Sequence, residues 1–140
     1  MIRGSIEKHA ISSKVKLNIL FQNIGNSNSM YRIMTLKEDL KSKERNVHLY
    51  SETVGAYLYF SSNKIRNGKT IFKSEPPIGS KENKEFLINA SKLNMVDVVS
   101  SYHFPVEPRF KCIDEGDFRK AFSGLCTAGF TLQAAWTALY

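Results

Sequence analysis

NVHLYSE at residues 46–52 alternates apolar and polar side chains, which is the pattern of a strand with one buried face. AYLYF at residues 56–60 follows it, and its aromatic side chains have high strand propensity. We therefore predict a strand over residues 46–52 whose extended character continues through residues 56–60. This strand is the second of three predicted strands along the chain.

Two apolar runs flank this segment and predict two more strands. KLNILFQ at residues 16–22 is bounded by Gly25 and several Asn and Ser residues, which indicates a buried strand ending in a loop. VDVVS at residues 96–100 is a short apolar strand of the type found in parallel sheets.

Helical periodicity separates these strands. Residues 29–42 carry apolar side chains at helical spacing, and Ser29 is predicted to cap the N-terminal end of that helix. A second helix is predicted from Lys81, and residues 118–140 are predicted to be largely helical with interruptions at Gly124 and Gly129. The apolar faces of the first two helices are formed by Ile33, Leu36 and Leu40, and by Phe86, Leu87, Ala90 and Leu93.

The order of elements predicts an α/β fold. Two long loops complete it: residues 63–80, which contain Pro76 and Pro77, and residues 102–117. Strands that alternate with helices form right-handed crossover units, so we expect a parallel sheet with helices packed outside. In such sheets the loops after the strands carry the chemistry, and here those loops contain Asn23, Ala56 and Tyr102.

Composition indicates one soluble domain. The chain has 140 residues and is 42% hydrophobic, which is enough for a real core. Its 20 Lys and Arg exceed its 13 Asp and Glu by 7, but acidic residues are interspersed in both Lys-rich stretches, residues 37–45 and 64–84. We interpret them as ordinary solvated surface, and we expect no nucleic-acid partner and no membrane partner.

The two cysteines indicate a reducing compartment. Cys112 and Cys126 lack the paired spacing of metal knuckles or redox loops, so we predict reduced thiols in a cytoplasmic protein. Residues 1–15 lack the apolar core of a secretory signal, and targeting to an organelle is the weaker alternative. Ser100, Ser101 and Cys126 are nucleophile candidates, but no base and acid accompany them. We interpret the serines as strand-end hydroxyls that bond backbone groups, and Cys126 as a small buried residue.

Four motifs resemble those of one enzyme family. ETVGAYLYF at residues 52–60 resembles a strand-six segment in which Glu-Thr is followed by Cys, a variable residue, a metal-binding His and Tyr-Leu. FKSEPPIG at residues 72–79, followed by Asn83, is similar to a Phe-Lys-Cys-x-Pro-Pro-Ile-Arg loop. VDVVSSYHFP at residues 96–105 resembles Ile-Asp-x-x-x-Ser-Asp-His-Ser-Pro. KCIDEGDFRKAFSG at residues 111–124 is close to the signature that distinguishes allantoinases from dihydroorotases and hydantoinases.

The chain therefore resembles the C-terminal part of an allantoinase-type cyclic amide hydrolase, over residues 47–140. The resemblance implies a partial (β/α)8 barrel with parallel strands and outer helices. We expect residues 16–140 to form this domain, and residues 1–15 stay unassigned. A full barrel has about 250 residues, so the early strands lie outside this sequence, and a truncated gene product is one interpretation.

The resemblance also implies where a metal site would be. Family members use a pair of divalent metal ions, usually zinc, to generate a hydroxide that attacks a cyclic amide, converting allantoin to allantoate in purine catabolism. Ala56 stands where the family has its strand-six histidine, and Tyr102 stands where it has the catalytic aspartate. Asn23 is the nearest polar candidate for the strand-five histidine.

The side chains at these positions predict a site that neither binds metal ions nor catalyses hydrolysis. A methyl group offers no lone pair, a phenol is a poor base at neutral pH, and an amide is a poor transition-metal ligand. We expect no bound metal or other cofactor, no catalytic residue and no hydrolysis by this chain. His103 survives from the family motif, but without partners we interpret it as a packed or loop-supporting residue.

The alternative function is that of a noncatalytic interaction or regulatory subunit. Part of a barrel leaves strand edges unpaired, and such edges pair readily with another chain. We therefore expect a homo-oligomer, or a complex with a full-length relative, formed through the exposed strand edges.

Overall fold

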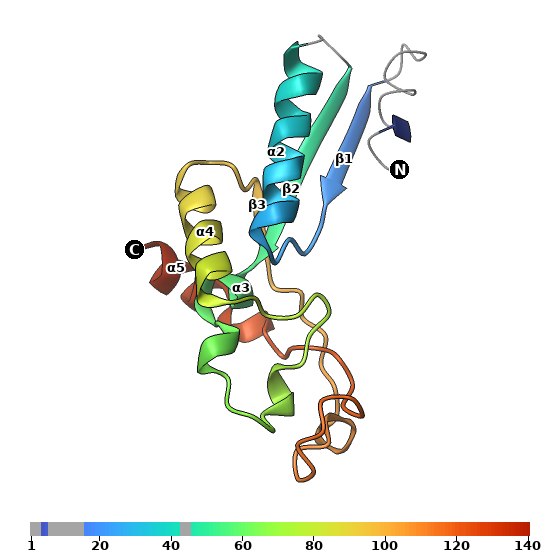
Figure 1. Ribbon diagram of the computed structural model, residues 1–140, viewed down its shortest axis with the longest axis vertical. Helices are drawn as coiled ribbons and strands as arrows, with labels where there is room; N and C mark the ends of the chain where they lie inside the picture. Colours follow the sequence, from blue (N-terminus) through green and yellow to red (C-terminus); the bar gives the residue numbers. More distant parts are fainter. Residues whose placement is uncertain (1–3, 6–15, 43–45) are drawn as a thin grey trace.

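A parallel three-stranded sheet lies in the upper half of the molecule in the view of Figure 1, and loops with short helical turns form the lower half. The computed structural model describes residues 4–5, 16–42 and 46–140. Within these residues the strand order is β1-β2-β3, with β1 at Leu17–Phe21, β2 at Val47–Val54 and β3 at Val98–Ser100. The helices are α2 at Ser27–Ser42, α3 at Gly55–Tyr59, α4 at Lys81–Lys92 and α5 at Thr131–Leu139. The predicted α/β class and the crossover order are confirmed.

The strand register brings the carboxyl ends of all three strands to one edge. β1 pairs with β2 from Leu17↔Val47 to Phe21↔Ser51. β2 then pairs with β3 from Glu52↔Val98 to Val54↔Ser100. Because both pairings are parallel, the loops that leave the three strands emerge on the same side, with β1 ending beside Ser51 and β3 ending beside Val54.

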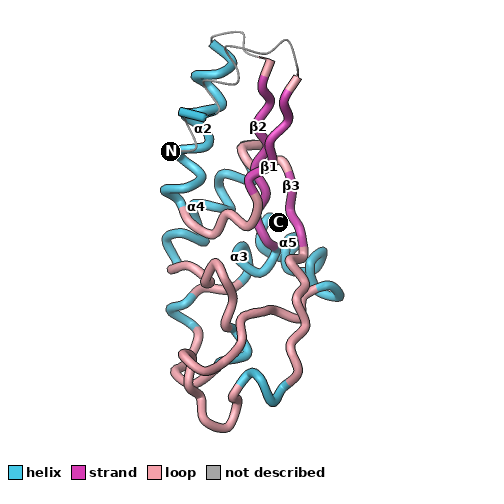
Figure 2. The backbone as a smooth tube through the Cα atoms, turned by 90° about the vertical axis from the view of Figure 1, so that its right-hand side faces the viewer, coloured by secondary structure: helices cyan, strands magenta, loops and turns pink. Residues whose placement is uncertain are grey.

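Helices cover one face of the sheet. Leu36 and Leu40 of α2 are buried against Val47 and Leu49 of β2, and the alternate residues of β1 pack against the same cluster. A second cluster joins α2, α3 and α4 around the lower part of the sheet, with Leu87 among its buried members. Figure 2 shows α2 and α4 lying on the same side of the three strands. Burying such a side chain contributes about 1.5–3 kcal/mol.

An ion pair fastens α2 to the end of this sheet. Lys37 Nζ lies 2.5 Å from Asp97 Oδ2, and the same carboxylate accepts hydrogen bonds from the backbone N–H and the hydroxyl of Ser51 at 2.7 and 2.9 Å. Burial alone would raise the pKa of Asp97, but the hydrogen bonds from Lys37 and Ser51 lower it below its ordinary value. The α2 helix and the segment entering β3 are therefore held by one side chain.

The prediction that residues 56–60 continue the strand is wrong. The chain turns into α3 directly after Val54, and Gly55, Ala56, Tyr57 and Leu58 are all buried. A strand would have sent alternate side chains to opposite faces, whereas a short helix buries four successive residues between its neighbours. A Cβ at Gly55 would lie 3.1 Å from the carbonyl oxygen of Thr131, so the close approach of α5 favours glycine at this turn.

Two other boundaries differ from expectation. Asn26, not Ser29, caps α2, since the backbone N–H of Ser29 donates to Asn26 Oδ1 at 2.9 Å. Asn and Ser are comparable N-cap residues, so the sequence alone does not choose between them. Leu93 was predicted to belong to the apolar face of α4, but it ends the helix and is 65% exposed.

The chain end is less helical than predicted. Residues 118–127 contain turns and a bridge between His103 and Leu125, and only α5 and a short turn before it are helical. The backbone N–H of Phe104 donates to the carbonyl oxygen of Leu125 at 2.9 Å. Gly124 has φ +144° and lies so close to Phe104 that a Cβ would be 2.5 Å from its carbonyl oxygen. Pairing between distant loops therefore overrides the helical periodicity.

Other expectations fall outside what the structure describes. The unassigned segment, residues 1–15, includes residues 1–3 and 6–15, which lie outside the described residues, so the boundary at residue 16 stays a prediction. In the described part of the chain, none of the helices has both the length and the apolar character that a membrane span needs.

We predict that Leu87→Ala lowers the free energy of unfolding by about 2–5 kcal/mol, because Leu87 is 1% exposed and its truncation leaves a cavity in the main hydrophobic cluster. Leu93→Ala is the matched control, and it should change stability by less than about 0.5 kcal/mol because this side chain lies in solvent. Urea denaturation followed by circular dichroism measures both. Equal effects of the two substitutions would contradict the assignment of this core.

Candidate functional site

The three predicted site positions meet at the carboxyl edge of the sheet. Ala56 and Tyr102 each lie two residues beyond the paired residues Val54 and Ser100, so they stand at equivalent steps on neighbouring strands. Asn23 follows β1 at the same edge, where the backbone N–H of the next residue, Ile24, donates to the carbonyl oxygen of Glu52 at 2.9 Å. The parallel register thus brings together residues that are far apart in the sequence.

Ala56 is part of the core, not of an open site. It lies inside α3, is 4% exposed and packs within the main hydrophobic cluster. Its methyl group has no lone pair and reaches no solvent. The position that the family motif gives to a metal-binding histidine is therefore filled by an apolar contact.

Asn23 has a polar group without a partner. Its φ of 56° is in the left-handed region, which Asn adopts more readily than most residues. Its Oδ1 atom is buried and has no hydrogen-bond partner, which costs about 1–3 kcal/mol. An amide oxygen suits hard cations better than zinc, so this orphaned acceptor does not by itself make a transition-metal ligand.

Two tyrosines hold the loop that passes over this edge. Tyr57 Oη donates to the carbonyl oxygen of Pro76 at 2.7 Å, and Tyr102 Oη donates to the carbonyl oxygen of Glu75 at 2.7 Å. Burial and, secondarily, the neighbouring Tyr102 raise the pKa of Tyr57 from 10.0 to about 12. Each phenol uses its proton to fix a backbone carbonyl. We call this pair the tyrosine clamp, and sequence reasoning did not foresee it.

A buried carboxylate lies beside the site. Glu52 is 6% exposed, and its Oε1 accepts a hydrogen bond from Ser100 Oγ at 2.7 Å. Ser100 was predicted to bond a backbone group, and this is wrong because its hydroxyl turns to a side chain on the neighbouring strand. Ser101 matches the prediction, since its Oγ accepts the backbone N–H of His103 at 3.3 Å.

His103 supports a loop, as predicted. Its Nδ1 accepts hydrogen bonds from the backbone N–H groups of Thr127 and Ala128, both at 3.0 Å. This nitrogen is therefore committed to holding the start of the last helical segment. Cys126 was predicted to be buried, but it is exposed, because the adjacent Leu125 takes the buried side of the chain. Cys126 and Cys112 are both free thiols.

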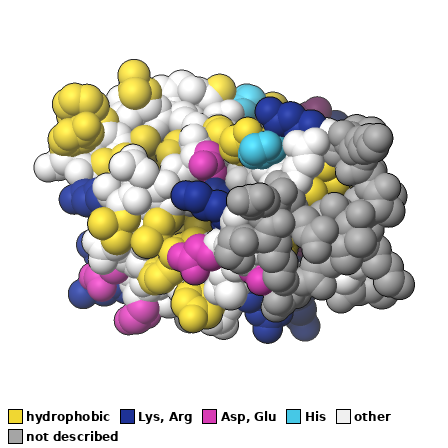
Figure 3. All heavy atoms as spheres, turned by 90° about the horizontal axis from the view of Figure 1, so that it is seen from above, with side chains coloured by type: hydrophobic (Ala, Val, Ile, Leu, Met, Phe, Trp, Pro, Cys, Tyr) yellow, Lys and Arg dark blue, Asp and Glu magenta, His cyan; other side chains and the backbone are white. Residues whose placement is uncertain are grey.

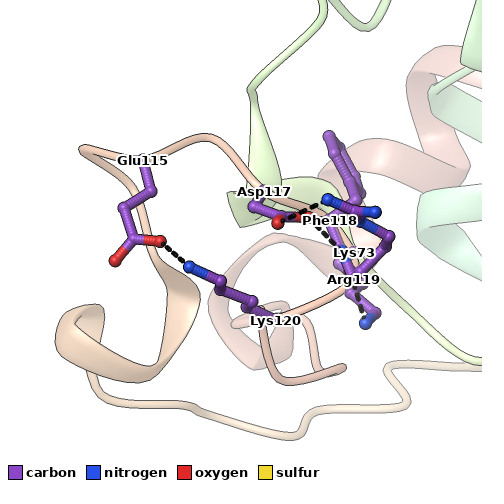
Figure 4. A network of polar contacts seen from close by, with 6 residues as sticks. All are labelled: Lys73, Glu115, Asp117, Phe118, Arg119 and Lys120. Atoms are coloured by element: carbon purple, nitrogen blue, oxygen red, sulfur yellow. Dashed lines mark hydrogen bonds and ion pairs between the residues drawn. The ribbon is translucent and has the colours of Figure 1, made fainter.

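A lysine joins the loops beyond the tyrosine clamp. Lys111 is 6% exposed, and its Nζ donates to the carbonyl oxygens of Lys73, at 3.2 Å, and of Gly124. Burial and then the nearby Lys73 ammonium lower the pKa of Lys111. Lys73 Nζ in turn donates to the carbonyl oxygen of Phe118 at 2.6 Å (Figure 4). Two ammonium groups thus tie together loops that have almost no regular secondary structure.

Surface ion pairs surround these lysines. Lys120 Nζ lies 2.8 Å from Glu115 Oε2, and Arg119 pairs with Asp117 at 3.2 Å (Figure 4). On the face shown in Figure 3, Lys and Arg side chains are scattered among acidic and apolar ones and form no single patch.

The residues present do not fit a pair of metal ions. A pocket of about 500 Å³ opens beside Tyr102, lined by apolar and mixed charged side chains, among them Lys73, Glu75 and Phe104. In residues 4–5, 16–42 and 46–140, no three His, Cys, Asp or Glu side chains are grouped as metal ligands. Ala56 and Tyr102 offer a methyl group and a phenol, and of the nearby acidic and imidazole groups Glu52 accepts from Ser100 while His103 Nδ1 accepts two backbone N–H groups. This arrangement does not match the ligand set of a binuclear centre.

Comparisons with known proteins agree on a family and a fold. No protein-family model matches the chain. The chain is 41% identical over 97 residues to the mitochondrial allantoinase of Aquarana catesbeiana. The aligned region makes up 69% of this chain and 20% of the relative. It is 38% identical over 86 residues to the allantoinase of Arabidopsis thaliana, covering 61% of this chain and 17% of the relative.

Solved structures support the same barrel. The L-hydantoinase of Arthrobacter aurescens superposes with a TM-score of 0.70 at 19% identity, covering 94% of this chain and 28% of that one. The D-hydantoinase of Thermus sp. superposes with a TM-score of 0.68 at 16% identity, and the match covers 84% of this chain and 25% of the hydantoinase. These likenesses show the fold. The chain spans about a fifth of the length of the curated relatives it matches.

We predict that alkaline pH destabilises the protein through Tyr57. Its folded-state pKa of about 12 lies above its unfolded value of 10.0, so its contribution is complete below pH 10 and is lost as pH rises towards 12. The loss amounts to roughly 2–3 kcal/mol. Denaturant midpoints measured from pH 9 to 12 should fall less steeply in Tyr57→Phe than in the unsubstituted protein. Tyr59→Phe is the control for an exposed phenol, and an unchanged slope in Tyr57→Phe would show that this assignment is wrong.

Proposed function

The chain is an allantoinase-like segment of an amidohydrolase barrel, and on this premise we propose that it does not hydrolyse cyclic amides itself. Its relatives named allantoinase imply allantoin as the compound to test. The observation that carries the proposal is the filling of the carboxyl edge of the sheet. A buried methyl group occupies one motif position, and a phenol committed to a backbone carbonyl occupies another.

The chemistry of these groups supports inactivity. Hydrolysis by two metal ions needs imidazole and carboxylate donors that hold the metals and shuttle a proton. Ala56 offers no donor atom to a metal, and Tyr102 Oη donates its hydrogen bond to the backbone carbonyl oxygen of Glu75, 2.7 Å away. The other polar groups near the edge are also committed, since Ser100 bonds Glu52 and His103 Nδ1 accepts two backbone N–H groups. Among the described residues, Asn23 Oδ1 is a buried acceptor without a hydrogen-bond partner, and so are the hydroxyl oxygens of Ser74 and Ser123. An amide oxygen and two neutral hydroxyls do not supply the imidazole and carboxylate donors of a binuclear centre.

We predict substoichiometric zinc and no allantoin turnover above background for the purified chain. Inductively coupled plasma mass spectrometry measures the metal, and a colorimetric assay of allantoate measures turnover. The double substitution Ala56→His with Tyr102→Asp should bind more zinc, because it restores two donors of the required kinds. Tyr102→Asp alone is the second variant, since a histidine inside α3 can disturb packing.

Two results decide against the proposal. One is stoichiometric zinc in the unsubstituted chain together with conversion of allantoin to allantoate. The other is equal zinc binding by the unsubstituted chain and both variants, because the proposal requires that Ala56 and Tyr102 limit binding.

A second candidate function is that of a noncatalytic interaction or regulatory subunit. The specific observation is that β1 and β3 are the outer strands of the sheet in the described part of the chain, so each has one edge without a partner strand there. Unpaired edges favour association with another chain. The partner is a second copy or a full-length amidohydrolase, and the two functions are compatible because neither needs a metal.

We place the protein in the cytoplasm as a further part of this proposal. Both cysteines are free thiols, which suits a reducing compartment. One relative is a mitochondrial allantoinase, so the competing location is an organelle. Fractionation of cells that express the chain with a C-terminal tag separates these two outcomes.

A further inference from the structure

A pocket opens in the loops that follow α3, apart from the positions that the family motifs mark. Its volume is about 490 Å³, which is within the range of small-molecule sites in proteins. Its lining comes from residues 62–78 and from Phe118 of a later loop, and it includes no residue of β1, β2 or β3. In the view of Figure 1 the segment 62–78 lies below the sheet. The pocket is therefore built by the loops themselves.

Apolar side chains form much of the lining. They are Ile65, Phe72, Pro77, Ile78 and Phe118. Ile78 is 7% exposed, and the ring of Phe72 packs edge-on against that of Phe60 with centroids 5.0 Å apart. Lys73 Nζ donates to the carbonyl oxygen of Phe118 at 2.6 Å, which holds the later loop against the first (Figure 4). A ligand of this pocket needs an apolar body, and the two phenylalanine rings favour an aromatic one.

One polar group lies at the buried end of the pocket. Ser74 is 4% exposed, and its Oγ atom is buried without a hydrogen-bond partner among the described residues. The phenol of Tyr57 is near it, but that phenol donates its proton to the carbonyl oxygen of Pro76 at 2.7 Å. Buried side-chain hydroxyls usually have a partner, so this one marks a place where a polar group of a ligand fits.

The segment that forms the pocket is basic. Residues 64–73 include Lys64, Arg66, Lys69 and Lys73 and contain no Asp or Glu. Arg66 lines the pocket and is exposed, and in the described part of the chain no carboxylate forms an ion pair with it. The charged lining residues are Arg66, Lys73 and Glu75, so two cations and one carboxylate leave one positive charge. A ligand with a single negative charge matches this lining, and a guanidinium binds a carboxylate through two parallel hydrogen bonds.

We propose that this pocket binds a small aromatic monocarboxylate with a hydroxyl or carbonyl group at the end opposite its carboxylate. The exposed guanidinium of Arg66 binds the carboxylate, and the rings of Phe72 and Phe118 contact the aromatic body. The hydroxyl of Ser74 bonds the polar group at the buried end. Inorganic anions match the pocket less well because they have no apolar body.

This binding function goes beyond the function proposed above and does not depend on it. The pocket differs from the one beside Tyr102, since Lys73 and Glu75 are the only lining residues that the two pockets share. Neither Ala56 nor Tyr102 lines it. Loss of a metal site at the carboxyl edge of the sheet therefore leaves this pocket intact.

Titration of the purified 140-residue chain with 4-hydroxybenzoate tests the proposal, because this probe has a carboxylate and a hydroxyl at opposite ends of one ring. Two-dimensional nitrogen-15 NMR follows the backbone amides. We expect saturable shifts centred on residues 62–78 and on Phe118. The dissociation constant for 4-hydroxybenzamide, which lacks the charge, should be higher by about tenfold or more. Benzoate, which lacks the hydroxyl, should also bind more weakly than 4-hydroxybenzoate.

Three variants assign the binding to named side chains. Arg66→Gln should raise the dissociation constant for 4-hydroxybenzoate by about tenfold or more, because it removes the partner of the carboxylate. Lys69→Gln is the matched control, since Lys69 is an exposed cation of the same loop that does not line the pocket, and the constant should stay within about twofold. Ser74→Ala should abolish the preference for 4-hydroxybenzoate over benzoate. Circular dichroism verifies that all three variants are folded.

Several results overturn the proposal. The first is the absence of saturable shifts in the unsubstituted chain. Equal weakening by Arg66→Gln and Lys69→Gln also overturns it, because the attraction is then that of a basic surface. Inorganic phosphate that binds as tightly as 4-hydroxybenzoate shows that the apolar walls contribute nothing, and an unchanged preference in Ser74→Ala removes the polar contact at the buried end. Zinc content and allantoin turnover are measured separately, so failure of this binding leaves the proposed inactivity standing.

Discussion

The pairing of β2 with a parallel neighbour on each side is the constraint on which the rest of the structure depends. β1 takes the first part of β2 and β3 takes the last part, and this stagger sets the level at which each following loop begins. Asn23, Ala56 and Tyr102 lie at one edge of the sheet because the three strands run parallel, although nearly eighty residues separate the first from the last. The Asp97 carboxylate, bound to Ser51 and Lys37, secures the point where β3 joins and where α2 crosses the sheet.

Regular patterns in the sequence predicted the elements whose neighbours are close in the chain. The strands at residues 16–22 and 46–52 and the helix from Lys81 follow from local periodicity, and tertiary contacts agree with it. The prediction of a strand over residues 56–60 is wrong although the aromatic side chains there have high strand propensity. The segment is buried by contacts with α4 and α5, and this burial favours a helix. Residues 118–127 failed because the bridge between His103 and Leu125 cannot be inferred from either segment alone.

In the candidate site too, the sequence predicted the positions of residues but not their contacts with distant segments. Motif positions identified Ala56 and Tyr102, and the rule that loops follow strands of a parallel sheet placed them at one edge. The contacts that give these residues their roles join distant segments: Tyr102 reaches back to Glu75, and Ser100 reaches back to Glu52. Sequence spacing does not predict that the Tyr102 hydroxyl donates to a carbonyl oxygen 27 residues away. Nor does it predict that the Ser100 hydroxyl donates to a carboxylate 48 residues away. The motifs therefore indicated which positions lack a metal-donor side chain. The hydrogen-bond partners of the polar side chains that are present come from the structure alone.

The ammonium group of Lys111 limits which side chains can be substituted in the loops around it. It donates to the carbonyl oxygens of Lys73 and Gly124, and together with the hydrogen bond from Lys73 to Phe118 it joins irregular segments that contain almost no helix or strand. Side chains that point away from this anchor can be exchanged without moving the backbone. A segment held in this way keeps its backbone position while the side chains on its outer surface are free to differ in chemistry.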